Sequence, residues 1–341
     1  MLSEKELKEI RDELESSERP LFFFHDDVDG LCSFLLLYRH IQRGKGHIVK
    51  TNPRITKEFM RFVKDYDPDK IFILDVAQLD QEFVDEAKLP IIWVDHHGPY
   101  DIKNVKYFNP RIKDKDAYIP ASQICYEVVK KDLWLGTIGT IGDGGNADFV
   151  KDFAKEYPDI LDPKIKDRDK MQFESGLTKL IQILSFNLKG GSEDIKKAIK
   201  ILTRIESPYE ILKQETERGR LICRRCLKIS REYEELFREA LKIKAKNNIY
   251  VFEYTEKTTS LSSEIANVIF YRHPEWTIVI ARKKGDEMKC SLRSHIVDLR
   301  KVVEKTLKEV EGFGGGHPQS SAIILKAEGF KRFIEILQKD L

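Results

Sequence analysis

A group of imidazole and carboxylate side chains directly follows a short apolar run near the start of the chain. Residues 20–24 read Pro-Leu-Phe-Phe-Phe, and His25, Asp26, Asp27 and Asp29 come immediately after them. An uninterrupted aromatic run of this length is typical of a strand that is buried on both faces. Imidazole and carboxylate ligands suit Mn²⁺ or Mg²⁺, and no thiolate lies among them to favour zinc. The alternative is an acidic turn in which an aspartate caps the helix that follows.

Two further apolar runs end on the same kinds of residue. Residues 70–74 and 90–94 read as buried strands, and the residues that follow them are Asp75, Asp95, His96 and His97. In an open α/β sheet, ligands bind at the carboxyl ends of the parallel strands. Clustered carboxylates also repel one another unless they are protonated or bind a metal. The three strand ends together therefore predict a site for one or two cations.

A fourth segment adds another carboxylate. The apolar residues 133–141 lead into Gly142-Asp143-Gly144-Gly145. Asp143 is therefore a candidate metal ligand at the end of a buried segment, with an ordinary Asp-Gly turn as the alternative.

The alternation of strands and helices in the first half predicts an α/β fold with a parallel sheet. Helices are expected at 3–16, 57–66, 81–87 and 118–132, and strands at 20–24, 47–50, 70–74 and 90–94.

The middle of the chain is expected to be helical. A long helix is expected from Ser207-Pro208, with an apolar seam at Ile222, Cys226, Ile229, Tyr233, Leu236, Ala240 and Ile243. Its steps of four and three predict packing along another helix, which would link domains or join subunits in a homo-oligomer through residues 210–245. Cys223 and Cys226 have no second cysteine pair, so packing explains Cys226 better than zinc or redox chemistry does.

The last part of the chain predicts a second, smaller α/β unit. Strands are expected at 248–254, 276–282 and 288–293, and helices at 262–271, capped by Ser260 or Ser262, and at 297–310. A glycine-rich loop follows, in which Gly314, Gly315 and Gly316 precede His317. Consecutive glycines allow a ligand to approach the backbone, whose N–H groups can bind an oxyanion. Weaker candidates for the surface that binds this ligand are Asn267, Arg282 and Ser291.

Length and composition set broad limits. A chain of 341 residues with 41% hydrophobic residues suggests two domains with sizeable cores. The net charge of +2 neither requires nor excludes nucleic acid as a partner. Five scattered cysteines and a charged N-terminal segment predict a reduced, cytoplasmic protein without a signal peptide. No apolar run approaches the ~18 residues of a membrane-spanning helix, so no membrane partner is expected.

The motifs together resemble the DHH-family phosphoesterases. HDDVDG at residues 25–30 resembles the first motif, Asp75 the second, Asp95-His96-His97-Gly98 the third and Asp143 the fourth, in family order. The glycine run before His317 resembles the associated substrate-binding domain. The His-x-Asp-x-Asp spacing is similar to the RecJ-like branch, and the length to the short archaeal RecJ-like nucleases. The resemblance implies a DHH catalytic domain over 1–190, a helical connector or interaction region over 191–247 and a substrate-binding domain over 248–341.

The resemblance also implies roles for individual residues. His25, Asp27 and Asp75 would hold one divalent cation, and Asp29, Asp75, His96 and Asp143 the other. Both ions would be Mn²⁺ by preference, with Mg²⁺ as the alternative. Asp95 would orient a histidine, and His97 would face the scissile phosphate. Arg293 and His317, with the Gly314–Gly316 amides, would hold the neighbouring phosphate.

The activity implied is metal-dependent hydrolysis of phosphodiester bonds. We expect an exonuclease on single-stranded DNA or RNA, in DNA repair or replication and with a repair or replication protein as a further partner. Polarity does not follow from the sequence, and 3′→5′ is the direction we favour. One alternative is a phosphodiesterase of short oligonucleotides or cyclic dinucleotides, and another is an inactive repair or replication scaffold.

Overall fold

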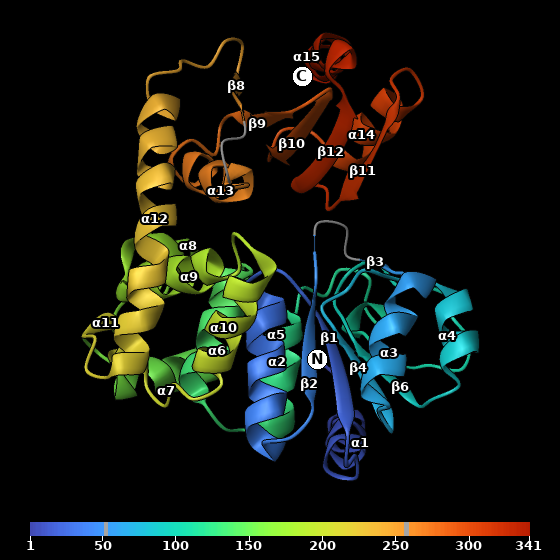
Figure 1. Cartoon of the computed structure of the whole chain (residues 1–341). Coiled ribbons are helices and arrows are strands. Elements are labelled where there is room, and N and C mark those ends of the chain that lie inside the picture. Colours follow the sequence, from blue (N-terminus) through green and yellow to red (C-terminus); the bar gives the residue numbers. More distant parts are fainter. Residues whose placement is uncertain (51–53, 256–258) are drawn as a thin grey trace. The chain divides into compact units, whose positions relative to one another are not determined.

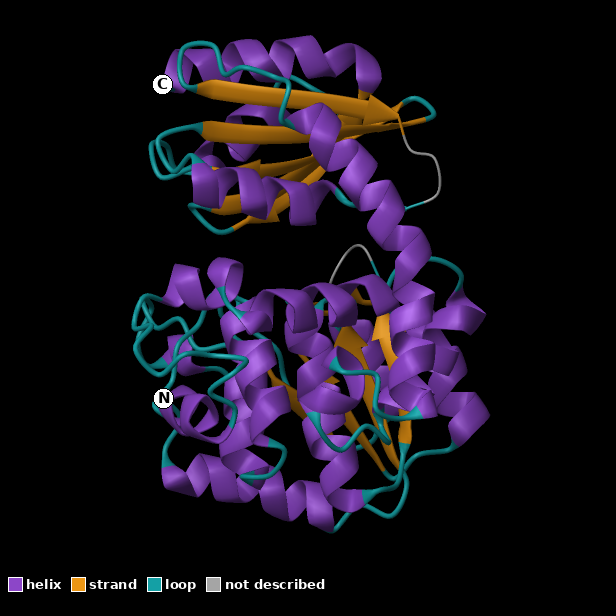
Figure 2. Ribbon diagram, turned by 90° about the vertical axis from the view of Figure 1, so that its left-hand side faces the viewer, coloured by secondary structure: helices purple, strands orange, loops and turns teal. Residues whose placement is uncertain are grey.

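The computed structural model describes residues 1–50, 54–255 and 259–341. The chain forms two compact units, which are described separately. The N-terminal unit comprises residues 1–188 and 192–224, and the C-terminal unit comprises residues 189–191 and 225–341. Strands and helices of both units are visible in Figures 1 and 2. In the described ranges, no helix has the length and apolar character needed to cross a bilayer.

The N-terminal unit is built on a five-stranded sheet in the order β2-β1-β4-β6-β7, and every pairing is parallel. Its strands are β1 Pro20–His25, β2 Lys45–Val49, β4 Lys70–Leu74, β6 Ile91–Val94 and β7 Lys106–Phe108. A small second sheet pairs β3 Arg54–Ile55 with β5 Gln78–Leu79. The predicted parallel-sheet α/β class is therefore confirmed, and β7 is a strand that the sequence patterns did not indicate.

Helices cover both faces of this sheet (Figure 1). Leu21 and Phe23 of β1 share a core with α3 Met60–Tyr66 and α4 Gln81–Ala87. Phe22 and Phe24 point to the opposite face, where their rings lie 5.5 and 4.5 Å from that of Phe34 in α2 Val28–Ile41. This alternation explains why the aromatic run is buried on both faces.

Further helices complete the unit. They are α1 Glu4–Glu15, α5 Ala121–Val129, α6 Leu133–Gly142, α7 Phe149–Glu156, α8 Arg168–Glu174, α9 Gly176–Asn187, α10 Ser192–Leu202 and α11 Pro208–Leu212. The expected helix at 57–66 begins as a 3₁₀ turn, Lys57–Phe59, before α3. The helix expected at 118–132 is shorter at both ends, because Pro120 precedes α5 and Lys130 ends it in a left-handed conformation.

The prediction of one long helix from Ser207-Pro208 is wrong. The chain forms α11 and then begins again as α12, Glu217–Ala240. Gln214 between them has a φ of 55°, a left-handed conformation that cannot continue a right-handed helix. The seam is buried from Ile222 to Ala240, but Ile243 lies beyond the helix end and is 41% exposed. Self-association through this helix stays a prediction.

The C-terminal unit has a five-stranded sheet in the order β11-β12-β10-β9-β8, in which only the β8–β9 pair is parallel. Its strands are β8 Ile249–Thr255, β9 Thr277–Lys284, β10 Glu287–Arg293, β11 Gly312–Gly316 and β12 Ser320–Lys326. Its helices are α13 Ser262–Arg272, α14 Leu299–Leu307 and α15 Phe330–Asp340. α14 and α15 share a core with one face of the sheet.

Two local predictions for this unit are wrong. The residue before α13 is Leu261, which has no capping side chain, so neither Ser260 nor Ser262 caps the helix. The glycine-rich segment is not a loop, because Gly312–Gly316 pairs with β12 as an exposed edge strand.

Candidate metal centre

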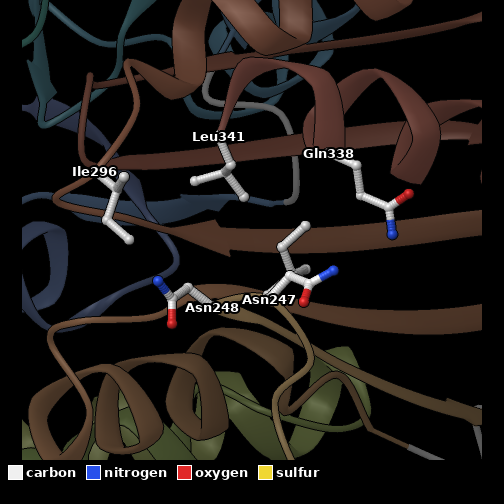
Figure 3. A pocket seen from close by; sticks show the side chains of 6 residues that line it. Asn247, Asn248, Ile296, Gln338 and Leu341 are labelled. Atoms are coloured by element: carbon white, nitrogen blue, oxygen red, sulfur yellow. The ribbon is translucent and has the colours of Figure 1, made fainter.

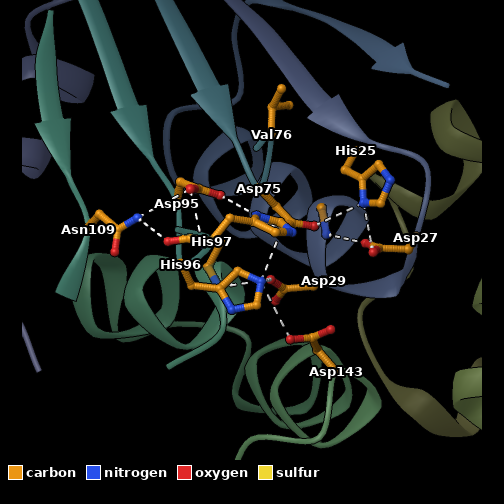
Figure 4. A network of polar contacts seen from close by, with 12 residues as sticks. His25, Asp27, Asp29, Asp75, Val76, Asp95, His96, His97, Asn109 and Asp143 are labelled. Atoms are coloured by element: carbon orange, nitrogen blue, oxygen red, sulfur yellow. Dashed lines mark hydrogen bonds and ion pairs between the residues drawn. The ribbon is translucent and has the colours of Figure 1, made fainter. Parts of the chain in front are cut away.

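The parallel register brings the three motif strands to the same edge of the sheet. Phe24 of β1 is paired with Leu74 of β4, and Leu74 is paired with Val94 of β6. The residues that follow, His25, Asp75 and Asp95, therefore lie at the same level at this edge of the sheet. Figure 4 shows these side chains pointing toward one another, together with Asp143 from the end of α6.

Asp75 lies at the centre of the cluster and is only 1% exposed. Its Oδ2 is 3.4 Å from His25 Nδ1, and its Oδ1 is 3.3 Å from His96 Nε2. Its φ of 55° is left-handed, a conformation that aspartate tolerates better than most residues. Its backbone N–H donates to the carbonyl of Val94, which holds the turn against β6. The carboxylate thus has one imidazole near each of its two oxygens.

His25, Asp27 and Asp75 form one group that could hold a metal ion. His25 Nδ1 is 2.8 Å from Asp27 Oδ2. The other oxygen of Asp27 accepts a hydrogen bond of 2.9 Å from the N–H of Gly30, so this aspartate caps α2. The capping alternative and the ligand interpretation are therefore compatible, because each uses a different oxygen. Asp26 lies beside the same imidazole, 3.5 Å from Nε2.

Gly30 allows this close approach of α2 to β1. A Cβ atom at this position would lie 2.5 Å from the carbonyl oxygen of His25 and 2.7 Å from its nitrogen. Any other residue would therefore push the first turn of α2 away from the strand that carries His25.

Asp29, His96 and Asp143 form a second group. His96 Nε2 is 3.6 Å from Asp143 Oδ2 and 4.0 Å from Asp29 Oδ2. The two oxygens of Asp29 also accept hydrogen bonds of 2.8 Å from the N–H groups of Ala121 and Ser122, at the start of α5. This buried carboxylate therefore holds a helix N-terminus in addition to facing His96.

His97 and Asp95 form a hydrogen-bonded pair. His97 Nδ1 is 2.7 Å from Asp95 Oδ1, and the backbone N–H of His97 donates to Asp95 Oδ2. Tyr107 and Asn109 each donate to the same Oδ2 at 3.3 Å. Asp95 thus orients His97, whose Nδ1 is also 3.8 Å from Asp75 Oδ1. Sequence reasoning missed Tyr107 and Asn109, because no apolar run marks their short strand.

Tyr118 is a further residue of the site that the sequence did not indicate. Its hydroxyl is 2.7 Å from the backbone oxygen of Asp143 and 3.0 Å from Asp143 Oδ2. Its ring meets that of His96 edge-on at 5.5 Å, although the residue is 47% exposed. Tyr118 therefore borders the cluster and contacts a predicted ligand.

The charges of the cluster are poorly balanced by the protein alone. Burial, together with Asp75 and Asp143, raises the pKa of Asp29 well above its usual range. Burial and Asp75 raise the pKa of Asp143 to about 6, although His96 opposes this. Burial would lower the pKa of His25 and of His96, but the carboxylates around them outweigh it and raise both. These carboxylates therefore need either protons or cations.

The donor set fits divalent cations. Among the described residues, the buried Oδ2 of Asp75 accepts no hydrogen bond of acceptable geometry. The possible ligand groups contain only imidazoles and carboxylates, a set that Mn²⁺ accepts readily and Mg²⁺ accepts through the carboxylates. The structure therefore brings together all six predicted metal ligands, namely His25, Asp27, Asp29, Asp75, His96 and Asp143.

The predicted substrate-binding residues belong to the C-terminal unit. Arg293 ends β10 and donates to Asn267 Oδ1 at 2.8 Å. His317 exchanges backbone hydrogen bonds with Ser320 in the turn between β11 and β12. Gly314 and Gly316 lie so close to β12 that a Cβ would clash with its backbone, whereas a Cβ on Gly315 would meet open space. Packing thus explains two of the three glycines, whereas the surroundings of Gly315 would accept a side chain.

The C-terminal unit also has a hollow of about 400 Å³ (Figure 3). It is lined by Asn247, Asn248, Ile249, Ile296, Gln338 and Leu341. None of the predicted substrate-binding residues lines it.

Comparisons with known proteins identify the family. Residues 21–157 match the DHH family, N-terminal domain, and residues 247–341 match the DHHA1 domain. The chain therefore belongs to the DHH family of phosphoesterases, whose members are metal-dependent hydrolases. Its two-domain fold is that of the RecJ-like branch, as the structural comparisons below indicate.

Three solved structures illustrate the similarity of fold. RecJ from Thermus thermophilus in complex with Mn²⁺ is 15% identical with a TM-score of 0.72, covering 99% of this chain and 55% of that one. An exonuclease RecJ bound to manganese is 14% identical with a TM-score of 0.64, covering 98% of this chain and 94% of that one. CDC45 from Entamoeba histolytica is 11% identical with a TM-score of 0.51, covering 98% of both chains. This chain thus spans about half of the Thermus RecJ chain. Among curated proteins, no sequence matches it.

Proposed function

We propose that the protein is a metal-dependent phosphodiesterase that degrades single-stranded DNA or RNA from an end. The observation that carries this proposal is the convergence of six His and Asp side chains around Asp75, from the ends of β1 and β6, the start of α2 and the end of α6. Thermus RecJ, which shares the fold, has been solved with Mn²⁺ and with Mg²⁺. We keep 3′→5′ as the proposed direction.

The metal ligands divide into two sets in this proposal. His25, Asp27 and Asp75 would hold one cation, and Asp29, Asp75, His96 and Asp143 the other, with Mn²⁺ preferred and Mg²⁺ as the alternative. Bound divalent cations would lower the pKa of a water molecule and neutralise charge on the phosphate oxygens. The protein's own contribution is to hold the carboxylates close enough together that cations relieve their repulsion.

His97 would bind the phosphate. Burial would lower the pKa of this imidazole, but Asp95 outweighs burial and raises it. Asp95 engages Nδ1, so Nε2 is the atom that would donate to a substrate oxygen. Asp95 itself acts by orienting the ring, and Tyr107 and Asn109 in turn hold Asp95.

The C-terminal unit would bind the substrate phosphate beside the scissile bond. Arg293 and His317 supply donors, and the Gly314–Gly316 backbone allows close approach. The open space at Gly315 supports this role, since the fold itself would tolerate a side chain there.

Digestion of end-labelled strands tests the proposal. Single-stranded DNA and RNA carrying a label at either end are incubated with the protein and Mn²⁺, and the products are sized. We expect stepwise shortening from one end, and loss of turnover in Asp75→Asn, because that variant cannot supply a shared anionic ligand. Normal turnover in Asp75→Asn, or internal cuts without end dependence, would contradict the proposal.

The same experiment separates the alternatives. Activity confined to dimers through pentamers on a ladder of lengths would indicate a phosphodiesterase of short oligonucleotides. Absence of both turnover and Mn²⁺ binding by calorimetry would indicate an inactive scaffold.

A further inference from the structure

Tyr118 lies beside the second group of candidate ligands, and much of its side chain is exposed. Its hydroxyl is 2.7 Å from the backbone oxygen of Asp143 and 3.0 Å from Asp143 Oδ2. Its ring meets the ring of His96 edge-on, with a distance of 5.5 Å between the centroids. Solvent nevertheless reaches 47% of the residue. A large aromatic side chain is thus in contact with two candidate ligands and accessible from outside.

The exposed part of Tyr118 is mainly its ring. Burial, together with Asp143, raises the pKa of the hydroxyl, so the protein encloses this end of the side chain. The hydroxyl is also engaged by Asp143, which leaves the ring as the part that solvent reaches. A ligand that approaches Tyr118 from solvent therefore meets an apolar aromatic surface.

Contacts with the metal centre fix the position of this ring. Two residues after Tyr118, Pro120 precedes α5, and the N–H of Ala121 donates to Asp29 Oδ2 at 2.8 Å. The segment is thus bonded to Asp29 through the start of α5 and to Asp143 through the hydroxyl. A tyrosine has only two side-chain torsions, so a ring held in this way loses little conformational freedom when a ligand packs against it.

The position of the ring restricts the chemistry of that ligand. Positioning Asp143 requires only the hydroxyl, so the exposed ring is available for a second contact. A ligand there would bring an anion to cations held by the carboxylates and a flat apolar surface to the ring. A nucleotide carries both groups on one sugar. Bases stack on aromatic side chains without regard to sequence, because every base has a π face.

We propose that the ring of Tyr118 stacks on the base of the nucleotide whose phosphate is held at the metal centre. This inference rests on the proposed function and adds that the enzyme binds the base as well as the phosphate. The contact favours nucleotides over phosphodiesters that have no base, and it does not select among the bases.

Tyr100 provides a comparison within the same unit. It is 41% exposed and follows the third motif by two residues. Its ring meets the ring of the buried Trp93 at 6.3 Å. In the ranges that the structure describes, no hydrogen bond or ring contact joins Tyr100 to a candidate metal ligand. An exposed tyrosine that does not contact the cluster is therefore available as a control.

The test separates the ring of Tyr118 from its hydroxyl. Tyr118→Phe and Tyr118→Leu both lack the hydroxyl and differ in the ring, so their comparison isolates stacking. Tyr100→Leu is the matched control. Each full-length protein is combined with single strands of about 20 nucleotides that carry either an ordinary terminal nucleotide or a stable abasic unit, prepared for each end of the strand.

Binding and hydrolysis are measured separately. Fluorescence anisotropy gives the affinity with Mn²⁺ present, for strands whose phosphorothioate linkages resist hydrolysis. Digestion of ordinary strands gives kcat and KM. Calorimetry gives the affinity for Mn²⁺, and thermal unfolding shows whether each variant is folded.

With ordinary strands, we expect Tyr118→Leu to bind at least about fivefold more weakly than Tyr118→Phe, because stacking of one base contributes about 1–3 kcal/mol. With an abasic unit at the attacked end, the two variants should bind within about twofold of each other. KM should rise in Tyr118→Leu relative to Tyr118→Phe, with kcat and Mn²⁺ affinity unchanged, because stacking stabilises bound substrate and transition state equally. Tyr100→Leu should match wild type on both kinds of strand.

Equal affinities of the two Tyr118 variants for ordinary strands would overturn the inference. An equal loss on ordinary and abasic strands would also overturn it, because the ring would then act through Asp143 or His96 and not through a base. The same loss in Tyr100→Leu would overturn it as well, since any exposed tyrosine would then have this effect.

Two further outcomes are distinguishable from these. If Tyr118→Leu does not fold, Tyr118→Phe alone decides, because equal binding of its ordinary and abasic strands would overturn the inference. Failure of the proposed function has a different signature, namely a wild-type protein that neither binds nor hydrolyses either kind of strand, and the inference would fall with it.

Discussion

Gly30 is the residue through which α2 and β1 fix the distance between the first motif and the rest of the site. An alanine Cβ there would lie 2.5 Å from the His25 carbonyl oxygen, whereas ordinary contact begins at 3.4 Å. The first turn of α2 would have to move by about 0.9 Å, and Asp27 and Asp29 would move with it. Overpacking of this kind costs about 1–3 kcal/mol, and the better helix propensity of alanine recovers about 1 kcal/mol.

We therefore expect Gly30→Ala to lower the free energy of unfolding by about 0–2 kcal/mol and to lower turnover by about 10²-fold, since displacements near 1 Å have effects of that size in active sites. Urea unfolding measures the first quantity. Mn²⁺-supported hydrolysis measures the turnover. Calorimetry with Mn²⁺ measures whether the displaced aspartates bind the ion more weakly.

Gly98→Ala is the matched control. This glycine follows the third motif as Gly30 follows the first, but a Cβ there would have no atom within 4 Å. We expect Gly98→Ala to keep wild-type stability and Mn²⁺ affinity. If Gly30→Ala also bound Mn²⁺ and turned over like wild type, the reasoning about helix placement would be refuted.

Three further predictions concern single contacts. Tyr118→Phe keeps the ring beside His96 but removes the hydroxyl bonded to Asp143, and we expect turnover to fall about fivefold with an unchanged melting temperature, in line with about 1 kcal/mol for one hydrogen bond; wild-type kinetics would rule out this positioning role. Arg39→Met removes two hydrogen bonds to the Asp132 carboxylate and one to the Ile205 carbonyl. Because a largely buried carboxylate is then unpaired, the variant should destabilise the N-terminal unit by about 3–5 kcal/mol in urea unfolding. A loss below about 1 kcal/mol would contradict this. The folded-state pKa of His47, about 4, lies below its unfolded value near 6.5, so the unfolded chain binds the extra proton between these pH values. Wild type should therefore lose stability as pH falls from 6.5 to 4, by about 1–2 kcal/mol, because solvent screens a side chain that is only partly buried. His47→Phe, which keeps the ring contact with Phe62, should show a smaller loss in unfolding measured at both pH values.

The parallel sheet and the candidate metal ligands could be predicted because each apolar run is followed directly by histidine or aspartate residues. β1, β4 and β6 each contain four or more consecutive apolar residues, and parallel pairing then fixes where the residues after these runs meet. The α/β class followed from the alternation of these strands with helices, and the expectation of two domains followed from the length of the chain.

Contacts that depend on short or glycine-rich segments could not be predicted. β7 has only three residues, Lys106-Tyr107-Phe108, so Asn109 gave no signal before the strand was seen beside β6. Gly312–Gly316 has little intrinsic preference for a strand, and it forms one because it pairs with β12. The sequence predicts Tyr118 at the start of a helix, but the residue lies before α5, where its hydroxyl contacts Asp143.

The hydrogen bonds from the first two N–H groups of α5 to Asp29 have a consequence for folding during synthesis. The two partners are separated by 92 residues, so during synthesis the aspartate leaves the ribosome well before the helix that satisfies its oxygens. Until then, an anion that the finished fold buries completely has no backbone donors, and the emerging β1 and α2 cannot close around it. Nascent chains arrested before residue 121 should therefore be digested by protease within their first fifty residues, and chains that have emerged past α6 should resist it.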